Sequence, residues 1–203
     1  MSFAFAGAHR TGKSTTAKIV AQRLGLPYLD SNVTKEMLAA GFDQVGNLDL
    51  ERRMECQEKR LELHMEKYAA APRPCITDRS PLDIAAYTLD EFSMHSSVEL
   101  GQRAAELVNR CVNLTRIHYD TLIVPRPLPV YLIEDGKPPP NVGFQHHVQY
   151  LIEGMVTSLS GEITTAILTV TSLEDRCDTV TDLIRERLED MAEWRKKAGA
   201  WIN

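Results

Sequence analysis

Short apolar runs alternate with longer amphipathic segments along most of this chain. Each run has the length and apolar character of a strand with two buried faces, whereas the segments between them carry apolar residues at helical spacing. The expected strands are 2–6, 27–29, 75–77, 121–125 and 163–171. The expected helices are 13–24, 50 to the break at Pro72, 81–92, 97–119 and 172–194.

This alternation of strands and helices favours a parallel sheet, because parallel strands need long crossover connections and bury both of their faces. We therefore predict an α/β fold of three layers, in which helices flank the sheet. With 203 residues, 43% of them hydrophobic, the chain is large enough for one such domain and short for two. We predict a single domain over 1–203, with its site at the carboxyl ends of the strands.

Residues 126–147 depart from this alternation, since they contain five prolines, two glycines and few apolar residues. Proline and glycine interrupt regular elements, so we expect a mobile lid over approximately 126–147. The turn Glu134–Lys137 either contacts nucleotide when the lid closes or is an ordinary polar turn. His146 and His147 are expected to be loop residues, because adjacent side chains point apart and no further ligands complete a metal site.

A glycine-rich segment lies between the first expected strand and the first expected helix. It reads Gly7-Ala8-His9-Arg10-Thr11-Gly12-Lys13-Ser14 and matches the phosphate-loop pattern GxxxxGK[ST] in full. Successive N–H groups of such a loop, and the N-terminus of the helix that follows, point at phosphate oxygens. The segment therefore predicts a P-loop NTPase fold with ATP and Mg²⁺ as cofactors.

Individual residues of this loop have expected roles. Lys13 would neutralise the β and γ phosphates, Ser14 would offer its hydroxyl to Mg²⁺, and Thr15 would lie near the α phosphate. The expected nucleotide-binding residues are Gly7, His9, Arg10, Thr11, Gly12, Lys13, Ser14 and Thr15.

Arg10 has a candidate catalytic role. Phosphoryl transfer commonly uses a second cation on the transferring group, often an arginine from a lid. Residues 127–175 contain no arginine and a single lysine, Lys137. Arg10 would then supply this charge from within the loop; the alternative is a solvated loop residue.

Two further polar groups follow expected strands. Asp78 and Arg79 come directly after 75–77, at the sheet edge that carries the phosphate loop if the two strands are neighbours. Asp78 could hold the Mg²⁺ or accept a proton from a hydroxyl, and Arg79 could clamp a phosphate. The alternative is a surface ion pair at a helix start, with Asp78 or Ser80 only capping the helix. Asp30 ends another strand and is a candidate base or sugar ligand, or an ordinary turn residue.

Composition narrows the class of partner. A net charge of −5 argues against a nucleic-acid partner and favours a small-molecule acceptor. The four cysteines are widely spaced without a CxxC pair, as expected for reduced thiols in the cytoplasm. No apolar run is long enough to span a membrane, and the first strand leads directly into the phosphate loop without room for a signal peptide. The oligomeric state stays open, a homodimer included.

The phosphate loop and the segment Asp78-Arg79-Ser80 together resemble the P-loop nucleoside and nucleotide kinases. These include thymidylate kinases, deoxynucleoside kinases and ATPase domains similar to nicotinamide riboside kinase. Some thymidylate kinases keep their catalytic arginine in the phosphate loop and have none in the lid, and the resemblance implies that Arg10 is this arginine. Those enzymes carry an acidic residue where this chain has His9. It also implies that Arg79 binds a phosphate, that Asp78 serves the metal or the acceptor, and that Asp30 is a base.

Three functions are consistent with these residues. The first is ATP- and Mg²⁺-dependent phosphoryl transfer to a nucleoside or a (deoxy)nucleoside monophosphate. The second is a kinase that acts on a modified base in DNA, which would need a basic groove that the charge balance does not indicate. The third is a regulatory ATPase switch, which would hydrolyse ATP without an acceptor. The Asp78-Arg79 pair favours a kinase, because a switch needs no acceptor clamp.

Overall fold

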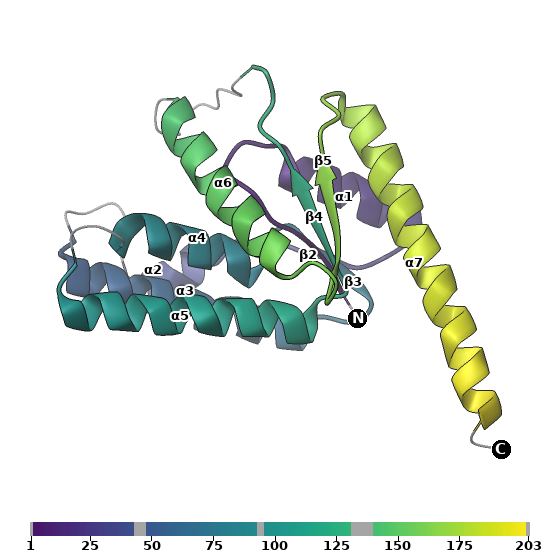
Figure 1. The fold of residues 1–203 in the computed structure, drawn as a ribbon, viewed down its shortest axis with the longest axis horizontal. Helices are drawn as coiled ribbons and strands as arrows, with labels where there is room; N and C mark the ends of the chain where they lie inside the picture. The colour runs from purple at the N-terminus through teal and green to yellow at the C-terminus, as the bar shows by residue number, and fades with distance from the viewer. Residues whose placement is uncertain (1, 43–47, 93–95, 131–139, 202–203) are drawn as a thin grey trace.

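The computed structural model of the chain shows a five-stranded parallel sheet between helices (Figure 1). The structure describes residues 2–42, 48–92, 96–130 and 140–201. The strands are β1 (Ser2–Phe5), β2 (Tyr28–Leu29), β3 (Cys75–Thr77), β4 (Thr121–Pro125) and β5 (Thr164–Leu168). They lie in the order β2-β3-β1-β4-β5, and each pair of neighbours is parallel. The carboxyl ends of all five strands therefore lie at one edge.

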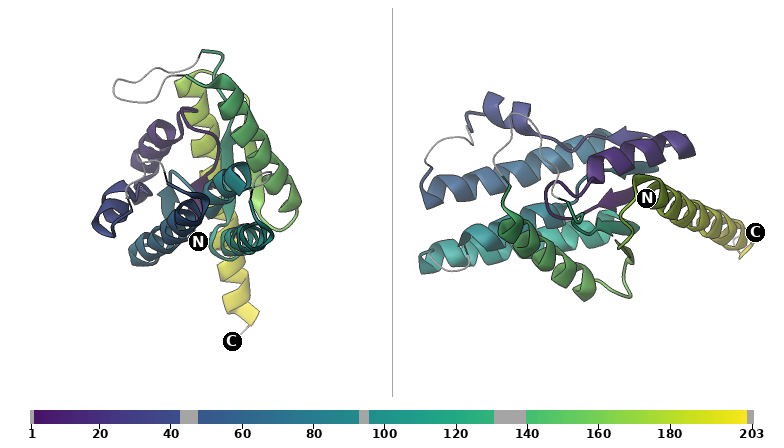
Figure 2. Two further views of the ribbon diagram at one scale, coloured as in Figure 1. Left: turned by 90° about the vertical axis from the view of Figure 1, so that its left-hand side faces the viewer. Right: turned by 90° about the horizontal axis from the view of Figure 1, so that it is seen from above.

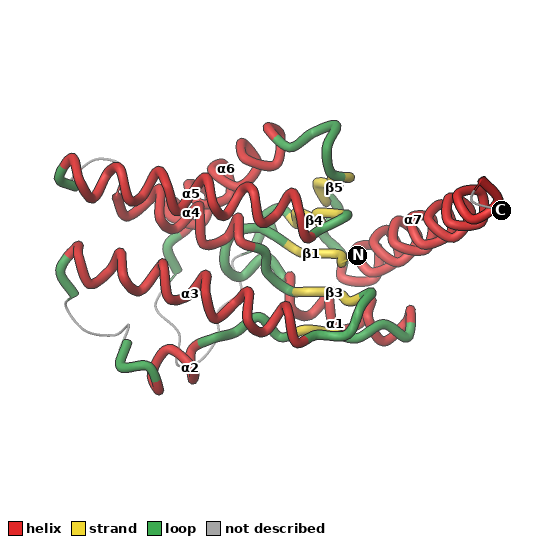
Figure 3. The backbone as a smooth tube through the Cα atoms, turned by 90° about the horizontal axis from the view of Figure 1, so that it is seen from below, coloured by secondary structure: helices red, strands yellow, loops and turns green. Residues whose placement is uncertain are grey.

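The helices cover both faces of this sheet, as predicted. They are α1 (Lys13–Leu24), α2 (Thr34–Ala39), α3 (Leu50–Ala70), α4 (Pro81–Phe92), α5 (Val98–His118), α6 (Val142–Ser158) and α7 (Leu173–Trp201). Figure 2 shows α1 and α6 on opposite sides of the strands. The C-terminal part of α7 extends beyond the sheet (Figure 3).

The alternation of side chains along β1 divides the core into two layers. Phe3 and Phe5 point to one face and pack with buried residues of α1 and α7, such as Val20 and Val180. Ala4 between them and Ala6 after them point to the other face, where buried residues of α3, α4 and α6 cover the sheet. Since both faces are buried, the strand contains no polar side chain apart from Ser2, which explains its continuous apolar sequence.

The expected strands and the five expected helices are confirmed, with ends shifted by a few residues. The helix caps follow the sequence signals: Asp49 accepts the N–H of Arg52 at 2.8 Å, and Ser97 accepts that of Leu100 at 3.2 Å. Helices α2 and α6 are absent from the predictions. No helix of the described residues is long and apolar enough to cross a membrane.

The predicted boundary of the lid at residue 147 is wrong. Helix α6 begins at Val142, with the side chain of Asn141 accepting the N–H of Phe144 at 3.0 Å. The prolines at 138–140 suggested an irregular segment, but they end before this cap. His146 and His147 therefore lie on a helix and not in a loop. The turn Glu134–Lys137 lies outside the described residues.

Candidate active site

The phosphate loop joins β1 to α1 and depends on residues with unusual backbone angles. Gly7, Arg10 and Gly12 have φ values of 150°, 57° and 81°. Glycine adopts these angles without strain, whereas Arg10 in the left-handed region is an exception of the kind found at functional sites. A Cβ on Gly7 would also lie 3.3 Å from both Gln149 Oε1 and Pro125 O. The loop thus requires glycine at position 7 for space as well as for conformation.

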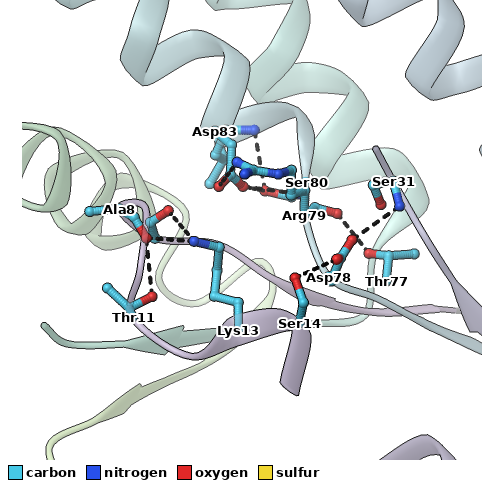
Figure 4. A network of polar contacts seen from close by, with 12 residues as sticks. Ala8, Thr11, Lys13, Ser14, Ser31, Thr77, Asp78, Arg79, Ser80 and Asp83 are labelled. Carbon is cyan, nitrogen blue, oxygen red and sulfur yellow. Dashed lines mark hydrogen bonds and ion pairs between the residues drawn. The ribbon is translucent and has the colours of Figure 1, made fainter. Parts of the chain in front are cut away.

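Lys13 lies across the inside of this loop (Figure 4). Its Nζ donates to the carbonyl oxygens of Gly7 at 2.7 Å and Ala8 at 2.6 Å. The side chain is buried, and this burial lowers the pKa of Lys13 to about 8. Among the described residues, the ammonium has only neutral carbonyls at hydrogen-bonding distance, so a phosphate group would be a stronger partner.

Asp78 lies beside the loop because β3 is the direct neighbour of β1. Its Oδ2 accepts hydrogen bonds from Ser14 Oγ at 2.7 Å and Tyr28 Oη at 2.8 Å, and its Oδ1 accepts the N–H of Ser31 at 3.0 Å. Burial alone would raise the pKa of Asp78, but these hydrogen bonds outweigh it and hold the pKa below its usual range. Asp78 is therefore a carboxylate, and with the Ser14 hydroxyl it offers the oxygen ligands that Mg²⁺ prefers.

Arg79 and Asp83 lie on the other side of Lys13, at the start of α4 (Figure 4). Asp83 Oδ2 accepts the N–H of Ser80 at 3.0 Å, while Ser80 Oγ accepts the N–H of Leu82 at 3.2 Å. This reciprocal arrangement is a capping box. Arg79 is about 41% exposed in its side chain, and its Nη1 lies 3.6 Å from Asp83 Oδ1. Arg79 thus lies near a buried carboxylate, and its guanidinium stays partly accessible.

A cavity of about 400 Å³ opens beside these residues, between α3 and α4. Its volume falls in the range of small-molecule sites. Polar lining residues include Asn32, Gln57, Arg60, Arg79, Asp83 and Tyr87. His64 also lines it; burial lowers its pKa to about 4, so this imidazole is neutral at physiological pH. The cavity therefore offers hydrogen-bond donors and acceptors, some of them charged, close to the phosphate loop.

The structure places three other predicted residues less centrally. Asp30 is exposed, accepts the N–H of Asn32 at 2.9 Å and does not line the cavity, which is the geometry of the turn alternative. Thr15 is exposed on the first turn of α1, and His9 is half-buried with its ring 5.4 Å from that of Phe144. Burial lowers the pKa of His9, and nearby cations lower it further. The catalytic roles of Asp30 and Arg10 stay predictions.

Two glutamines of α6 support the phosphate loop and were not predicted. Gln149 Oε1 accepts the N–H of Ala8 at 3.0 Å, and Gln145 Nε2 donates to the carbonyl of His9 at 2.8 Å. Both side chains are buried. Two glutamines four residues apart, on the same face of a helix as apolar residues, are the signal that could have indicated them. This signal depends on the helix, and α6 was not predicted.

Arg176 is a further supporting residue that the sequence did not indicate. It is 2% exposed, and its guanidinium donates to the carbonyls of Thr11 at 2.6 Å, Val170 at 2.6 Å and Arg126 at 2.9 Å. These bonds join the phosphate loop to the chain segments that follow β5 and β4. In a trans peptide the N–H points away from the C=O, so the bond to Thr11 directs the N–H of Gly12 away from Arg176.

The described residues contain no group of three or more His, Cys, Asp or Glu side chains that could hold a metal ion. His147 instead pairs with Asp90 at 3.2 Å on the neighbouring helix α4.

Comparison with known proteins supports the fold. The model of the AAA domain family matches residues 2–176. Deoxyadenosine kinase from M. mycoides with products dCMP and dCDP is similar at a TM-score of 0.61 and 12% identity, over 92% of this chain and 100% of that one. Thymidylate kinase from Candida albicans is similar at a TM-score of 0.59 and 18% identity, over 94% of this chain and 92% of that one. NadR protein in complex with NR is similar at a TM-score of 0.65 and 15% identity, over 91% of this chain and 50% of that one.

No curated protein matches the sequence itself. At identities this low, the structural similarity concerns the fold alone. The predicted resemblance to P-loop nucleoside and nucleotide kinases is confirmed at this level: a parallel sheet, a phosphate loop after β1 and a charged pair after β3.

Proposed function

This chain belongs to the AAA domain family, and on that premise we propose that it transfers the γ-phosphoryl group of ATP, with Mg²⁺, to a nucleoside or nucleoside monophosphate. The observation that carries the proposal is a polar cavity lined by Arg79 and Asp83, which are near enough to Lys13 of the phosphate loop to act on its charge. A phosphoryl transferase needs two adjoining sites, one for the donor phosphates and one for the acceptor.

On the donor side, the chain's own groups bind and orient the triphosphate. The loop N–H groups and the ammonium of Lys13 would contact phosphate oxygens, exchanging the carbonyl partners of Lys13 for anions. Ser14 and Asp78 would hold Mg²⁺, which neutralises charge on the β and γ phosphates when it is bound. Arg10 would add a further positive charge from within the loop.

On the acceptor side, the cavity favours a kinase over a regulatory switch, since a switch has no use for an enclosed second site. Its size and hydrogen-bonding groups suit a nucleoside or nucleotide. Two of the similar structures carry names of kinases for such compounds, deoxyadenosine kinase and thymidylate kinase. The net charge of −5 continues to argue against DNA as the acceptor.

We also propose a cytoplasmic location. All four cysteines are free and buried, which suits a reducing compartment. A homodimer and a single domain over 1–203 remain predictions from the sequence.

Replacing Arg79 with alanine should weaken use of the acceptor more than binding of ATP. A hydrogen bond to a charged group contributes about 1.5–3 kcal/mol, so the KM for the acceptor should rise on the order of 10-fold or more. The KM for ATP should change by less than about threefold. Steady-state kinetics with each substrate varied in turn will separate the two effects.

Arg116→Ala provides a matched control, because Arg116 has the same side-chain exposure of 41% but pairs with Glu162, which lies outside the cavity lining. Its kinetic constants should stay near those of the wild type. Equal losses for both substrates in Arg79→Ala would contradict the assignment of Arg79 to the acceptor.

A further inference from the structure

Asp83, which lines the cavity, has a buried carboxylate oxygen that lacks a hydrogen-bond partner. Asp83 is 2% exposed, its Oδ2 accepts the N–H of Ser80, and its Oδ1 accepts no hydrogen bond from any described residue. The nearest cation, Arg79 Nη1, lies 3.6 Å from Oδ1, beyond hydrogen-bonding distance. Buried polar atoms are nearly always hydrogen-bonded, so this oxygen requires an explanation.

The other acidic groups near the phosphate loop are already engaged. Asp78 accepts three hydrogen bonds and is suited to the metal. Glu91, the other carboxylate among the cavity-lining residues of the described chain, accepts the amide of Gln57 at 2.9 Å and lies near Arg53. Asp30 lies outside the lining. Of the described carboxylates at the cavity, Asp83 is thus the one with a buried oxygen available to a ligand.

The position of Asp83 places such a ligand next to the donor phosphates. It lies on the first turn of α4, beside Arg79, and in Figure 4 both lie on the side of the loop where the ammonium of Lys13 is found. Asp83 also acts electrostatically on Lys13, the residue expected to contact the γ phosphate. A hydroxyl that donates its proton to Oδ1 would therefore be held between the cavity and the transferring group.

We propose that Asp83 accepts the proton of an acceptor hydroxyl, so that the acceptor is a nucleoside-type alcohol and not a monophosphate that reacts through its phosphate. This inference rests on the proposed kinase function. In the step, the hydroxyl oxygen forms a bond to the γ phosphorus, and its proton passes to Asp83 Oδ1. The bond from the γ phosphorus to the bridging oxygen breaks, and its electron pair leaves with ADP.

A phosphate acceptor would not need this group. Its attacking oxygen is already anionic at neutral pH, and a carboxylate that points at it would repel it. A hydroxyl, by contrast, satisfies the free oxygen of Asp83 and gains a base at the same time. The arginines of the cavity would then bind the polar groups of the nucleoside.

The proposal predicts a pH dependence. Burial raises the pKa of Asp83, although neighbouring Lys13 and Arg79 lower it in part. The charged or titratable groups that act on Asp83 from the surrounding elements are Lys13, Asp78, Arg79, Tyr87 and Tyr119. As pH falls through the raised pKa, Asp83 becomes protonated and can no longer accept a proton. Turnover with a hydroxyl acceptor should therefore decline on the acid side.

The test compares the wild type, Asp83→Asn and Asp90→Asn with deoxynucleosides and with their 5′-monophosphates, from about pH 5 to 8. Asp90 is a suitable control because it lies on the same helix and pairs with His147 away from the cavity. We expect nucleosides to be the better acceptors and Asp83→Asn to lower kcat at least about 10²-fold, with the acid limb of the profile lost. Binding of a fluorescent ATP analogue should stay within about threefold of the wild type, which would show that the variant is folded.

The possible failures can be distinguished. If no acceptor stimulates ADP release by the wild type, the kinase function itself fails, and this inference with it. If monophosphates are phosphorylated and nucleosides are not, the kinase function stands and the role of Asp83 is overturned. Full activity of Asp83→Asn with nucleosides would overturn it as well. If Asp83→Asn does not fold, the pH dependence of the wild type decides. Wild-type turnover that does not decline toward acid pH would also overturn the role of Asp83.

Discussion

Replacing Lys13 with alanine should reduce ATP turnover on the order of 10³-fold while leaving the fold intact. Among the described residues, the ammonium of Lys13 lies inside the phosphate loop, within hydrogen-bonding distance of the carbonyl oxygens of Gly7 and Ala8, where it would meet the β and γ phosphates. The fold should persist because the substitution leaves no carboxylate without its hydrogen-bond partner: among the described residues, Lys13 is buried and donates to carbonyl oxygens. Steady-state ADP release and thermal unfolding will test the two statements separately.

A second readout reports on Lys13 directly. Because burial lowers the pKa of Lys13 to about 8, part of the side-chain population is neutral at pH 8, and bound phosphate would favour the charged form. ATP binding at pH 8 should therefore be accompanied by proton uptake. Calorimetry in two buffers of different ionisation enthalpy will measure this uptake, which should vanish in Lys13→Ala. Lys59→Ala, which removes a surface partner of Glu62, should preserve both turnover and uptake. Retained turnover in Lys13→Ala would contradict the assignment of the donor site.

Replacing Asp78 with asparagine should lower turnover on the order of 10²- to 10³-fold and raise the Mg²⁺ concentration needed for half-maximal activity. The amide has the shape of the carboxylate, so its oxygen can still accept the N–H of Ser31. It lacks the negative charge that a divalent cation requires. A Mg²⁺ titration at saturating ATP will measure the effect. Unchanged Mg²⁺ dependence would exclude Asp78 as a metal ligand.

The same variant should change the pH dependence of stability. The pKa of Asp78 is lowered on folding, so its hydrogen bonds stabilise the fold above the unfolded pKa of about 4, and this contribution is lost as pH falls through the folded pKa. The stability advantage of the wild type over Asp78→Asn should therefore shrink below about pH 4. Asp120→Asn is the matched control: Asp120 pairs with Arg187 at 3.2 Å just before β4, at the opposite edge of the sheet, so this variant should lose stability without any change in Mg²⁺ dependence.

The sequence predicted those parts of the fold and site in which neighbouring residues carry the information. The central strands β1, β3 and β4 are largely apolar because both of their faces are buried. The phosphate loop is a continuous motif between a strand and a helix. The placement of Asp78 beside the phosphate loop followed from one topological assumption, that β3 lies beside β1, and the structure confirms that β3 pairs with β1.

The remainder depends on contacts between distant segments. Thr11 and Arg176 are 165 residues apart, and Ala8 and Gln149 are 141 apart, so no local pattern relates them. Asp83 was not predicted as a site residue, for a different reason. Its spacing from Ser80 indicates a capping box, and only the structure shows that this role uses one of the two carboxylate oxygens.

The central claim, that this chain is a kinase with an acceptor site beside its phosphate loop, is tested most directly by ADP release from Mg-ATP. The wild-type protein should be assayed with nucleosides, deoxynucleosides and their monophosphates, together with a blank that contains no acceptor. The proposed function predicts strong stimulation by a subset of these compounds over the blank. Equal ADP release in every sample, the blank included, would contradict it and would favour a regulatory ATPase.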